Sequence, residues 1–281
     1  MKPPFLWVGG KRDLLPVLSE ILPKKFNNYY ELFLGGGAIF FHLADKTKRH
    51  WVLNDINMHL INAYRIIKKQ PIKLSSGLDF MRERHDEDFF YRCRKKFNSG
   101  KNGGKAYDAS LFLYLISKCF RGLWRENKKG LFNSPIHRPN HIKRPIPSKD
   151  TLLRTARIFR NLHKVSLTSC DFDEAMKKAG RPKEGDLVIL DPPYIPLNAT
   201  SNFTSYNSDG FSFEDQVRLA TKYQEMVHSG VQVVAFNNDV APVYDLYKGA
   251  TIHKVPLKRR IGAAKDKKHT LIHELIITNV Q

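Results

Sequence analysis

Short apolar runs alternate with stretches of helical periodicity along most of the chain. Runs rich in branched and aromatic residues predict strands at residues 29–34, 51–53, 165–168, 187–190 and 231–236. Strands separated by helices are typical of a mainly parallel sheet in an α/β fold. Two later runs, at 251–257 and 271–278, are joined without an intervening helix. They predict an antiparallel hairpin that closes one edge of the sheet.

The strand series is interrupted after the second strand. Helical patterns occupy residues 63–69, 89–97 and 109–119, and a stretch rich in Gly, Asn and Pro follows and ends at residue 147. The pattern predicts two domains. Residues 1–59 and 151–281 form an α/β domain, and residues 60–150 form a helical insertion.

Basic residues outnumber acidic ones: Lys and Arg number 47 and Asp and Glu 27, a formal net charge of +20. This excess favours a polyanionic partner, although an ordinary basic surface would have the same composition. Within the insertion, basic residues are interleaved with Phe120, Trp124 and Phe132. That arrangement suits a surface that follows phosphates and presents side chains to bases. Alternatively, the aromatic residues form the core of the insertion.

The cysteines and histidines predict neither a disulfide framework nor a metal site. Cys93, Cys119 and Cys170 lie far apart and outside any CxxC pair, and the 11 histidines form no HExxH motif. No apolar run is long enough to cross a bilayer, and the first residues lack the pattern of a secretory signal. We therefore expect a soluble, cytoplasmic protein with no membrane partner and no metal.

A glycine turn joins the first predicted strand to a helix. Without a Cβ at Gly35, Gly36 and Gly37, a ligand can approach the backbone closely at the start of that helix. Asp55 follows the next strand, where a carboxylate can accept hydrogen bonds from ribose hydroxyls. The pair indicates an adenosyl-containing ligand. A dinucleotide is disfavoured because Phe40 stands where that motif requires a small residue, and a tight turn without a ligand is the alternative.

The most specific motif is DPPY, at residues 191–194, which follows the apolar run 187–190. It lies at the carboxyl edge of the predicted sheet, where open α/β sheets bind ligands. Consecutive prolines fix φ and lack N–H groups, so nearby carbonyls stay oriented as acceptors. If Asp191 and the Pro192 carbonyl accept both hydrogens of an adenine N6 amine, its lone pair is localised for in-line attack on a sulfonium methyl. Tyr194 can stack on the base. The alternative is a turn that merely ends a strand.

These motifs, in this order, resemble those of the Dam-type (alpha-group) site-specific adenine-N6 DNA methyltransferases. That family opens with PF-x-W-x-GGK, matched by PFLWVGGK at residues 4–11, and continues with the glycine motif, a target-recognition insertion and DPPY. Residues 203–219 and HELIITN at 273–279 are similar to its later segments. The resemblance implies a Rossmann-like S-adenosylmethionine-dependent methyltransferase sheet with an inserted helical target-recognition subdomain.

The resemblance also implies roles for individual residues. The implied catalytic residues are Asp191, Pro192, Pro193 and Tyr194. Asp171 and Phe172 follow a strand at the position where the family contacts the cofactor adenine. The full set implied to bind S-adenosyl-L-methionine is Trp7, Lys11, Phe33, Gly35, Gly37, Asp55, Asp171, Phe172 and Asp191.

Residues 119–135 are similar to the family's base-contacting hairpin. Arg125 can pair with O6 and N7 of guanine, and Leu123 and Pro135 can touch a thymine methyl. Members that methylate GATC usually have Asn-Gly-Leu here, and Arg121 replaces that Asn. A second departure is the Ile-His-Arg that follows Pro135, where those members commonly have Phe or Tyr and Gly. GATC is therefore favoured, with two departures from the pattern. The implied DNA-binding residues are Arg121, Leu123, Arg125, Asn127 and Pro135.

The expected substrate is double-stranded DNA, from which the target adenine must be flipped at a cost of about a few kcal/mol. Tyr206 and Phe211 are either pocket aromatics or core residues, and the basic stretch 259–269 is either a phosphate clamp or a solvated loop. We expect a monomer on DNA. It acts either alone, in Dam-like methylation, or beside a cognate restriction endonuclease in a restriction-modification system.

Other function classes are weaker. RNA or protein-glutamine N-methyltransferases use related motifs, but the Asp of DPPY and the basic insertion favour DNA adenine. Cytosine C5 methylation needs a nucleophilic cysteine, usually after a proline, whereas the cysteines here follow Arg92, Lys118 and Ser169. A non-catalytic basic DNA-binding protein would have no need of an intact DPPY motif.

Overall fold

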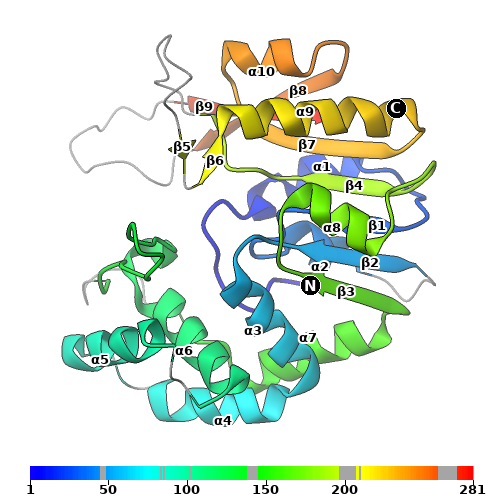
Figure 1. Cartoon of the computed structure of the whole chain (residues 1–281). Helices are drawn as coiled ribbons and strands as arrows, with labels where there is room; N and C mark the ends of the chain where they lie inside the picture. Colours follow the sequence, from blue (N-terminus) through cyan, green and yellow to red (C-terminus); the bar gives the residue numbers. More distant parts are fainter. Residues whose placement is uncertain are drawn as a thin grey trace. The chain divides into compact units, whose positions relative to one another are not determined.

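The computed structural model describes residues 1–44, 49–82, 84, 86–100, 103–137, 145–195, 207–208, 210–258 and 271–280. The chain divides into two compact units, Met1–Val17 with Leu34–Ala175, and Leu18–Phe33 with Met176–Gln281. The strand order is β3-β2-β1-β4-β7-β9-β8 (Figure 1).

The first unit is mainly helical. Its two strands run parallel, with His50 opposite Lys164 and Asn54 opposite Thr168. Two helices, α1 (Leu15–Ile21) and α8 (Phe172–Ala179), are shared between the units. The elements within the unit are η1 (Lys11–Leu14), α2 (Ala38–Leu43), β2 (His50–Asn54), α3 (Met58–Lys69), α4 (Pro71–Arg82), α5 (Glu87–Asn98), α6 (Lys105–Lys118), η2 (Phe120–Gly122), α7 (Lys149–Asn161) and β3 (Lys164–Thr168).

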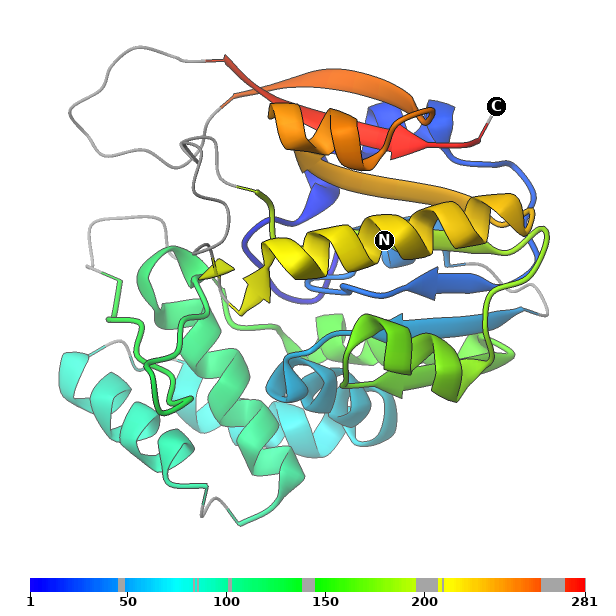
Figure 2. The same cartoon turned by 45° about the horizontal axis from the view of Figure 1, so that its top comes forward.

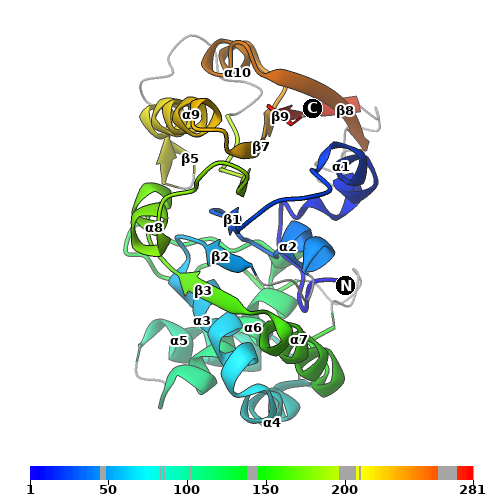
Figure 3. The ribbon, with the colours of Figure 1, turned by 90° about the vertical axis from the view of Figure 1, so that its right-hand side faces the viewer.

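Helix α6 is the centre of this unit. Every residue from Ala109 to Ser117 is buried, and α3, α4 and α5 pack around it (Figure 3). Side chains at the N-termini set where the surrounding helices begin. Asn57 accepts backbone N–H groups at the start of α3, and Asp86 does so for α5.

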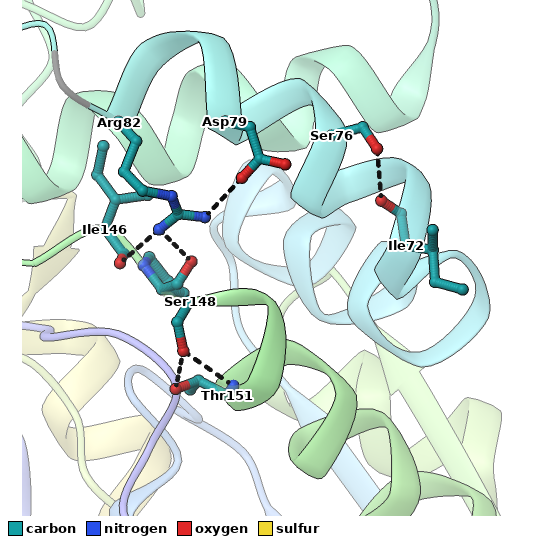
Figure 4. A network of polar contacts seen from close by, with 8 residues as sticks. Ile72, Ser76, Asp79, Arg82, Ile146, Ser148 and Thr151 are labelled. Carbon is teal, nitrogen blue, oxygen red and sulfur yellow. Dashed lines mark hydrogen bonds and ion pairs between the residues drawn. The ribbon is translucent and has the colours of Figure 1, made fainter.

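A polar network determines how the chain enters α7 (Figure 4). Arg82, at the end of α4, donates to the carbonyls of Ile146 and Pro147 at 3.2 and 3.0 Å. The Ser148 hydroxyl then accepts the N–H of Thr151 at 3.1 Å and begins the helix. The segment that precedes α7 is thus held against α4.

The second unit carries most of the sheet. β4 pairs in parallel with β1 and β7, whereas β9 runs antiparallel to both β7 and β8 (Figure 2). All residues of β4 are buried, as expected for a central strand. Helix α9 packs on β7 and begins at a capping box formed by Ser212 and Asp215. The elements are β1 (Tyr29–Glu31), β4 (Leu187–Leu190), β5 (Asn207–Ser208), β6 (Phe211–Ser212), α9 (Phe213–His228), β7 (Gln232–Asn238), α10 (Ala241–Leu246), β8 (Thr251–Lys258) and β9 (Leu271–Thr278).

The α/β class and the antiparallel terminal hairpin are confirmed. β1 is shorter than the predicted strand 29–34: the Leu32 N–H still bonds the carbonyl of Ile189 of β4, at 3.2 Å, whereas the Leu34 N–H bonds the carbonyl of Asn54, at 2.7 Å. Helices α4 and α7 were not anticipated. The domain boundaries 1–59, 60–150 and 151–281 stay a prediction. The two compact units divide the chain at other positions, but they do not show which residues form a target-recognition subdomain.

The structure describes all three cysteines and places each of them buried and in no disulfide. None of the helices in the described ranges has the length and apolar character needed to cross a membrane. No three His, Cys, Asp or Glu side chains of the described residues gather as they would around a metal ion.

Candidate active site

The turn after β1 leaves little room for a side chain, because of its backbone and because of Trp7. The φ angle of Gly35 is 47°, which strains other residues. A Cβ on Gly35 would lie 2.9 Å from Cδ1 of Trp7, and one on Gly36 would lie 3.1 Å from its Cβ. Trp7 therefore packs directly against the turn. Nearby, Lys11 is only 6% exposed and its Nζ donates to the Gly9 carbonyl at 2.9 Å.

Asp55 connects this turn to α3. Its Oδ2 accepts the N–H of Gly35 at 2.8 Å, and its Oδ1 accepts the N–H of Asn57 at 2.9 Å. A carboxylate accepts up to about four hydrogen bonds, so these two do not exclude ribose hydroxyls. The next apolar side chains are unusually exposed, with Ile56 at 73% and Met58 at 64%. This apolar surface beside Asp55 was not predicted from the sequence.

Asn54 places the segment that follows β3. The buried Asn54 side chain accepts the Thr168 hydroxyl at 2.9 Å and donates to the Cys170 carbonyl at 3.0 Å. Asp171 then accepts the N–H of Asp173 at 2.9 Å, where α8 begins. Phe172 is 2% exposed. The structure thus groups Trp7, Lys11, Gly35, Gly37, Asp55, Asp171 and Phe172 within the first unit.

Phe112, on α6, contacts two tryptophans. Its ring centroid lies 6.2 Å from that of Trp7 and 5.2 Å from that of Trp124. Trp124 also packs 4.8 Å from Phe132, which is 1% exposed. Phe132 is therefore a core residue, whereas Trp124 is half-buried and Phe120 is 43% exposed.

Residues 119–136 form a hairpin that leaves the end of α6 (Figure 1). Isolated antiparallel bridges join Cys119 to Ile136 and Glu126 to Phe132. At the tip, Asn127 Oδ1 accepts the N–H groups of Lys129 and Leu131 at 2.9 and 3.1 Å. Asn127 therefore shapes the turn.

The other predicted DNA-binding residues lie on this hairpin. Arg125 is exposed and Leu123 is 38% exposed. The exposed Pro135 accepts the N–H of Phe120 at its carbonyl, at 2.8 Å. Arg121 has a φ of 55° and ψ of 11°, a left-handed conformation that favours Gly and Asn.

The second unit holds DPPY directly after β4. Pro192 is buried, and the Pro193 carbonyl accepts Nε2 of Gln216 at 2.7 Å. The Tyr194 hydroxyl donates to the carboxylate of Glu274, on β9. Burial raises the pKa of Tyr194 well above its ordinary value, and the charges of Asp191 and Glu274 raise it further. Tyr194 is therefore a neutral hydrogen-bond donor at neutral pH.

Two further predictions concern aromatic residues of this unit. Phe33 and Phe211 pack edge to face, with ring centroids 5.7 Å apart. Phe211 is half-buried in β6. Tyr206 and the basic stretch 259–269 lie outside the described residues, as do the basic residues Lys101, Arg138, Lys143 and Arg144 of the insertion.

The motifs and the fold agree with one family. The model of the D12 class N6 adenine-specific DNA methyltransferases matches residues 7–261. The chain belongs to this family. Membership makes it an adenine-N6 DNA methyltransferase and removes the RNA, protein-glutamine and non-catalytic alternatives.

Relatives of two kinds are similar to this D12-class chain. The Type II methyltransferase M1.LlaDCHI of Lactococcus lactis subsp. cremoris is 37% identical over 99% of this chain and 95% of its own. The Type II methyltransferase M.MjaIII of Methanocaldococcus jannaschii is 33% identical over 99% of both chains. The DNA adenine methylase of Escherichia coli (strain K12) is 31% identical over 92% of this chain and 88% of its own.

Several residues of the site were missed from the sequence. Asn54, Gln216 and Asn237 are buried amides in otherwise apolar surroundings, and Glu274 is a buried carboxylate within the apolar strand β9. A polar residue inside a buried strand or helix face needs a partner, which is the signal that could have found them.

Proposed function

We propose that this chain transfers a methyl group from S-adenosyl-L-methionine to N6 of adenine in double-stranded DNA, at GATC sites. The observation that carries the proposal is the DPPY turn. The Pro193 carbonyl already has a donor in Gln216, and the Ile195 carbonyl has one in Asn238. Among the hydrogen bonds of the described residues, none reaches the carbonyl of Pro192.

The free acceptor suits an exocyclic amine. In the proposed reaction the Pro192 carbonyl and the Asp191 carboxylate each accept one N6 hydrogen, and Tyr194 stacks on the base. Accepting both hydrogens withdraws the amine lone pair from the ring and directs it at the methyl carbon. The N6–C bond then forms as the C–S bond breaks, and N6 loses one proton through its hydrogen bond to Asp191. The protein thereby contributes positioning and electrostatic stabilisation.

The first unit suits the cofactor. A bound S-adenosylmethionine supplies an electrophilic methyl group on a sulfonium. We propose that Asp55 accepts the ribose hydroxyls and that the exposed Ile56 and Met58 offer an apolar surface to the adenine ring. We also propose that Asp171 and Phe172 contact the adenine, and that Trp7, Lys11 and the glycine turn hold the remainder of the molecule. Gly35 and Gly37, which lack a Cβ, allow the backbone of the turn to approach the cofactor closely.

The hairpin suits base recognition. Arg125 and Leu123 are exposed on a hairpin whose tip is ordered by Asn127. We propose that Arg125 reads a guanine, that Leu123 and Pro135 contact a thymine methyl, and that Arg121 adds a phosphate contact. Catalysis on a paired adenine requires base flipping. The proposed active form on DNA is a monomer in the cytoplasm, and a partner endonuclease is proposed because two relatives are named Type II methyltransferases.

Methyl transfer to two matched plasmids tests the proposal. The purified protein is incubated at low salt with radiolabelled S-adenosylmethionine and with plasmids that contain or lack GATC, and the labelled base is identified. N6-methyladenine confined to the GATC plasmid is the expected result, and Asp191→Ala is the inactive control. N6-methyladenine in both plasmids would overturn GATC recognition alone, whereas no labelled adenine in either would overturn the proposed reaction.

A further inference from the structure

The turn that carries DPPY is tied to the rest of its unit by buried amide side chains. Gln216, on α9, donates Nε2 to the Pro193 carbonyl at 2.7 Å. Asn237, on β7, accepts the N–H of Ile195 at 3.1 Å and donates Nδ2 to Oε1 of Gln216, also at 3.1 Å. Gln216 is 3% exposed and Asn237 is fully buried.

The backbone determines how both amides are oriented. The Ile195 N–H can only donate, so Asn237 must present its oxygen there and its nitrogen to Gln216. The Pro193 carbonyl can only accept, so Gln216 must present its nitrogen there and its oxygen to Asn237. The chain of bonds is therefore satisfied in one arrangement, and Gln216, Asn237 and Ile195 are all buried.

The two backbone groups flank one residue. The Pro193 carbonyl belongs to the peptide before Tyr194, and the Ile195 N–H belongs to the peptide after it. Peptide groups are planar, so holding both planes fixes φ and ψ of Tyr194. The far end of the same side chain is held by Glu274, through the hydroxyl. Tyr194 is thus held at three points from α9, β7 and β9.

We propose that Gln216 and Asn237 are positioning residues for methyl transfer. They contact neither the base nor the cofactor. By holding the peptides on both sides of Tyr194, they keep its ring and the adjoining Pro192 carbonyl in the geometry that receives the target adenine. The inference rests on the proposed role of DPPY. Misplacement of a reacting group by about 1 Å costs on the order of 100-fold in rate, so loss of this link should act on the transfer step.

The test compares the same changes at two glutamines of α9. Gln216→Leu removes both hydrogen bonds, and Gln216→Glu keeps the acceptor and the size. Gln224→Leu and Gln224→Glu are the matched controls, because Gln224 bonds the carbonyl of Lys248 instead of the turn. The single-turnover rate is measured at saturating DNA and S-adenosylmethionine, with thermal unfolding in parallel. Gln216→Leu should lower this rate by about 10- to 100-fold, with KM for either substrate little changed, and the Gln224 variants should not lower it.

The Gln216→Glu variant adds a readout that a merely structural role would not change. In this variant an ionised carboxylate has no hydrogen to donate to the Pro193 carbonyl, whereas the protonated acid has one. Burial raises the pKa of a carboxyl group, which favours the protonated form. The ratio of variant to wild-type rate should therefore rise as pH falls. Other titratable groups around the turn are Asp191, Tyr194, Asp215 and Glu274, and because both proteins contain them, they cancel from the ratio.

Two results would overturn this role: a folded Gln216→Leu enzyme with the wild-type single-turnover rate, or a Gln216→Glu ratio that does not depend on pH. Failure of the proposed function looks different. If the wild-type enzyme methylates adenine outside GATC, the proposed recognition sequence is wrong. The Gln216 and Gln224 variants are then compared on the DNA that wild type methylates. If wild type methylates another acceptor, the same rate ratios are measured there.

Discussion

Arg125 and Asn133 are joined across the hairpin, where Nε of Arg125 donates to Oδ1 of Asn133 at 2.7 Å. The bond holds one edge of the guanidinium and orients the other for a base. Arg125→Ala should lose about 1–3 kcal/mol of discrimination at one guanine, as measured by methylation rates on a panel of singly altered sites. Asn133→Ala should cause a smaller loss at the same guanine.

Lys129→Ala is the control in the same hairpin, because the Lys129 side chain is exposed at the tip. Any loss of methylation rate in this variant should be equal across all the altered sites. A preference profile for Arg125→Ala that parallels wild type at every position would contradict the readout.

Asp55→Asn should weaken cofactor binding. The carboxylate accepts two backbone N–H groups, and an amide nitrogen would face one of them. In the proposed complex this carboxylate also accepts ribose hydroxyls, and hydrogen bonds to a charged group contribute about 1.5–3 kcal/mol. Their loss corresponds to roughly a 10- to 150-fold higher Kd for S-adenosylmethionine by calorimetry. Asp150→Asn, at an exposed ion pair on α7, is the control. Wild-type affinity in the Asp55 variant would remove Asp55 from the site.

Gly77→Ala should destabilise the protein, although Ala is normally better than Gly within a helix by about 1 kcal/mol. A Cβ at Gly77, in α4, would clash with Oγ of Ser110 in α6 and would lie 3.2 Å from its Cβ. Chemical denaturation should show a lower free energy of unfolding. The double variant Gly77→Ala/Ser110→Ala should recover part of the loss, because the clashing atom is absent, and additive effects of the two changes would argue against the clash.

Tyr223→Phe should protect the fold at alkaline pH. Its hydroxyl is buried and, within the described residues, has no hydrogen-bond partner. Burial raises the pKa of Tyr223 from 10.0 to about 12. The neutral form is therefore favoured in the native state, so the resulting stability is present below pH 10 and is lost as pH rises through 12.

The free energy of unfolding of Tyr223→Phe should fall less than that of wild type between pH 10 and 12. At pH 7 the variant should be as stable or more stable, by up to about 1 kcal/mol. Tyr91→Phe, in the other unit, controls for the loss of one phenol. An unfolding curve at pH 12 identical to that of wild type would contradict the expectation.

Arg121→Asn should stabilise the hairpin. At φ 55° an L-residue is strained by roughly 1 kcal/mol, and Asn tolerates this region better than Arg. The melting temperature should rise while affinity for DNA falls equally at all sites if Arg121 contacts a phosphate. Arg121→Gly separates the effects, since it relieves the strain without adding an amide. A lower melting temperature in both variants would show that the Arg side chain stabilises the hairpin.

The strands of the seven-stranded sheet were predictable because most are short, apolar runs bounded by turn residues, whereas β5 and β6 have two residues each and were not predicted. The helices were harder, because their first turns are polar: α3 and α5 begin at caps, Asn57 and Asp86, rather than where the apolar periodicity begins. Helix α4 was missed since it contains Pro71 and Gly77, which normally end or weaken helices, and only the facing Ser110 explains the glycine.

The motifs of the site were predictable, but the contacts that hold them were not. The DPPY motif and the glycine turn are each a short continuous segment with recognisable chemistry, and Asp55 directly follows a predicted strand. Gln216, Asn237 and Glu274 act on the DPPY turn from elements that follow it in the chain, so no local pattern joins them. Their partners become apparent only once β7 and β9 are paired.

The bond between Tyr194 and Glu274 joins residues 80 positions apart. A ribosome finishes DPPY long before it reaches β9, and β9 can pair with β7 only after leaving the exit tunnel. The nascent chain therefore contains the whole catalytic motif while its tyrosine still lacks this anchor. By this order of synthesis, we expect a chain that has not yet reached β9 to be a poor methylating agent.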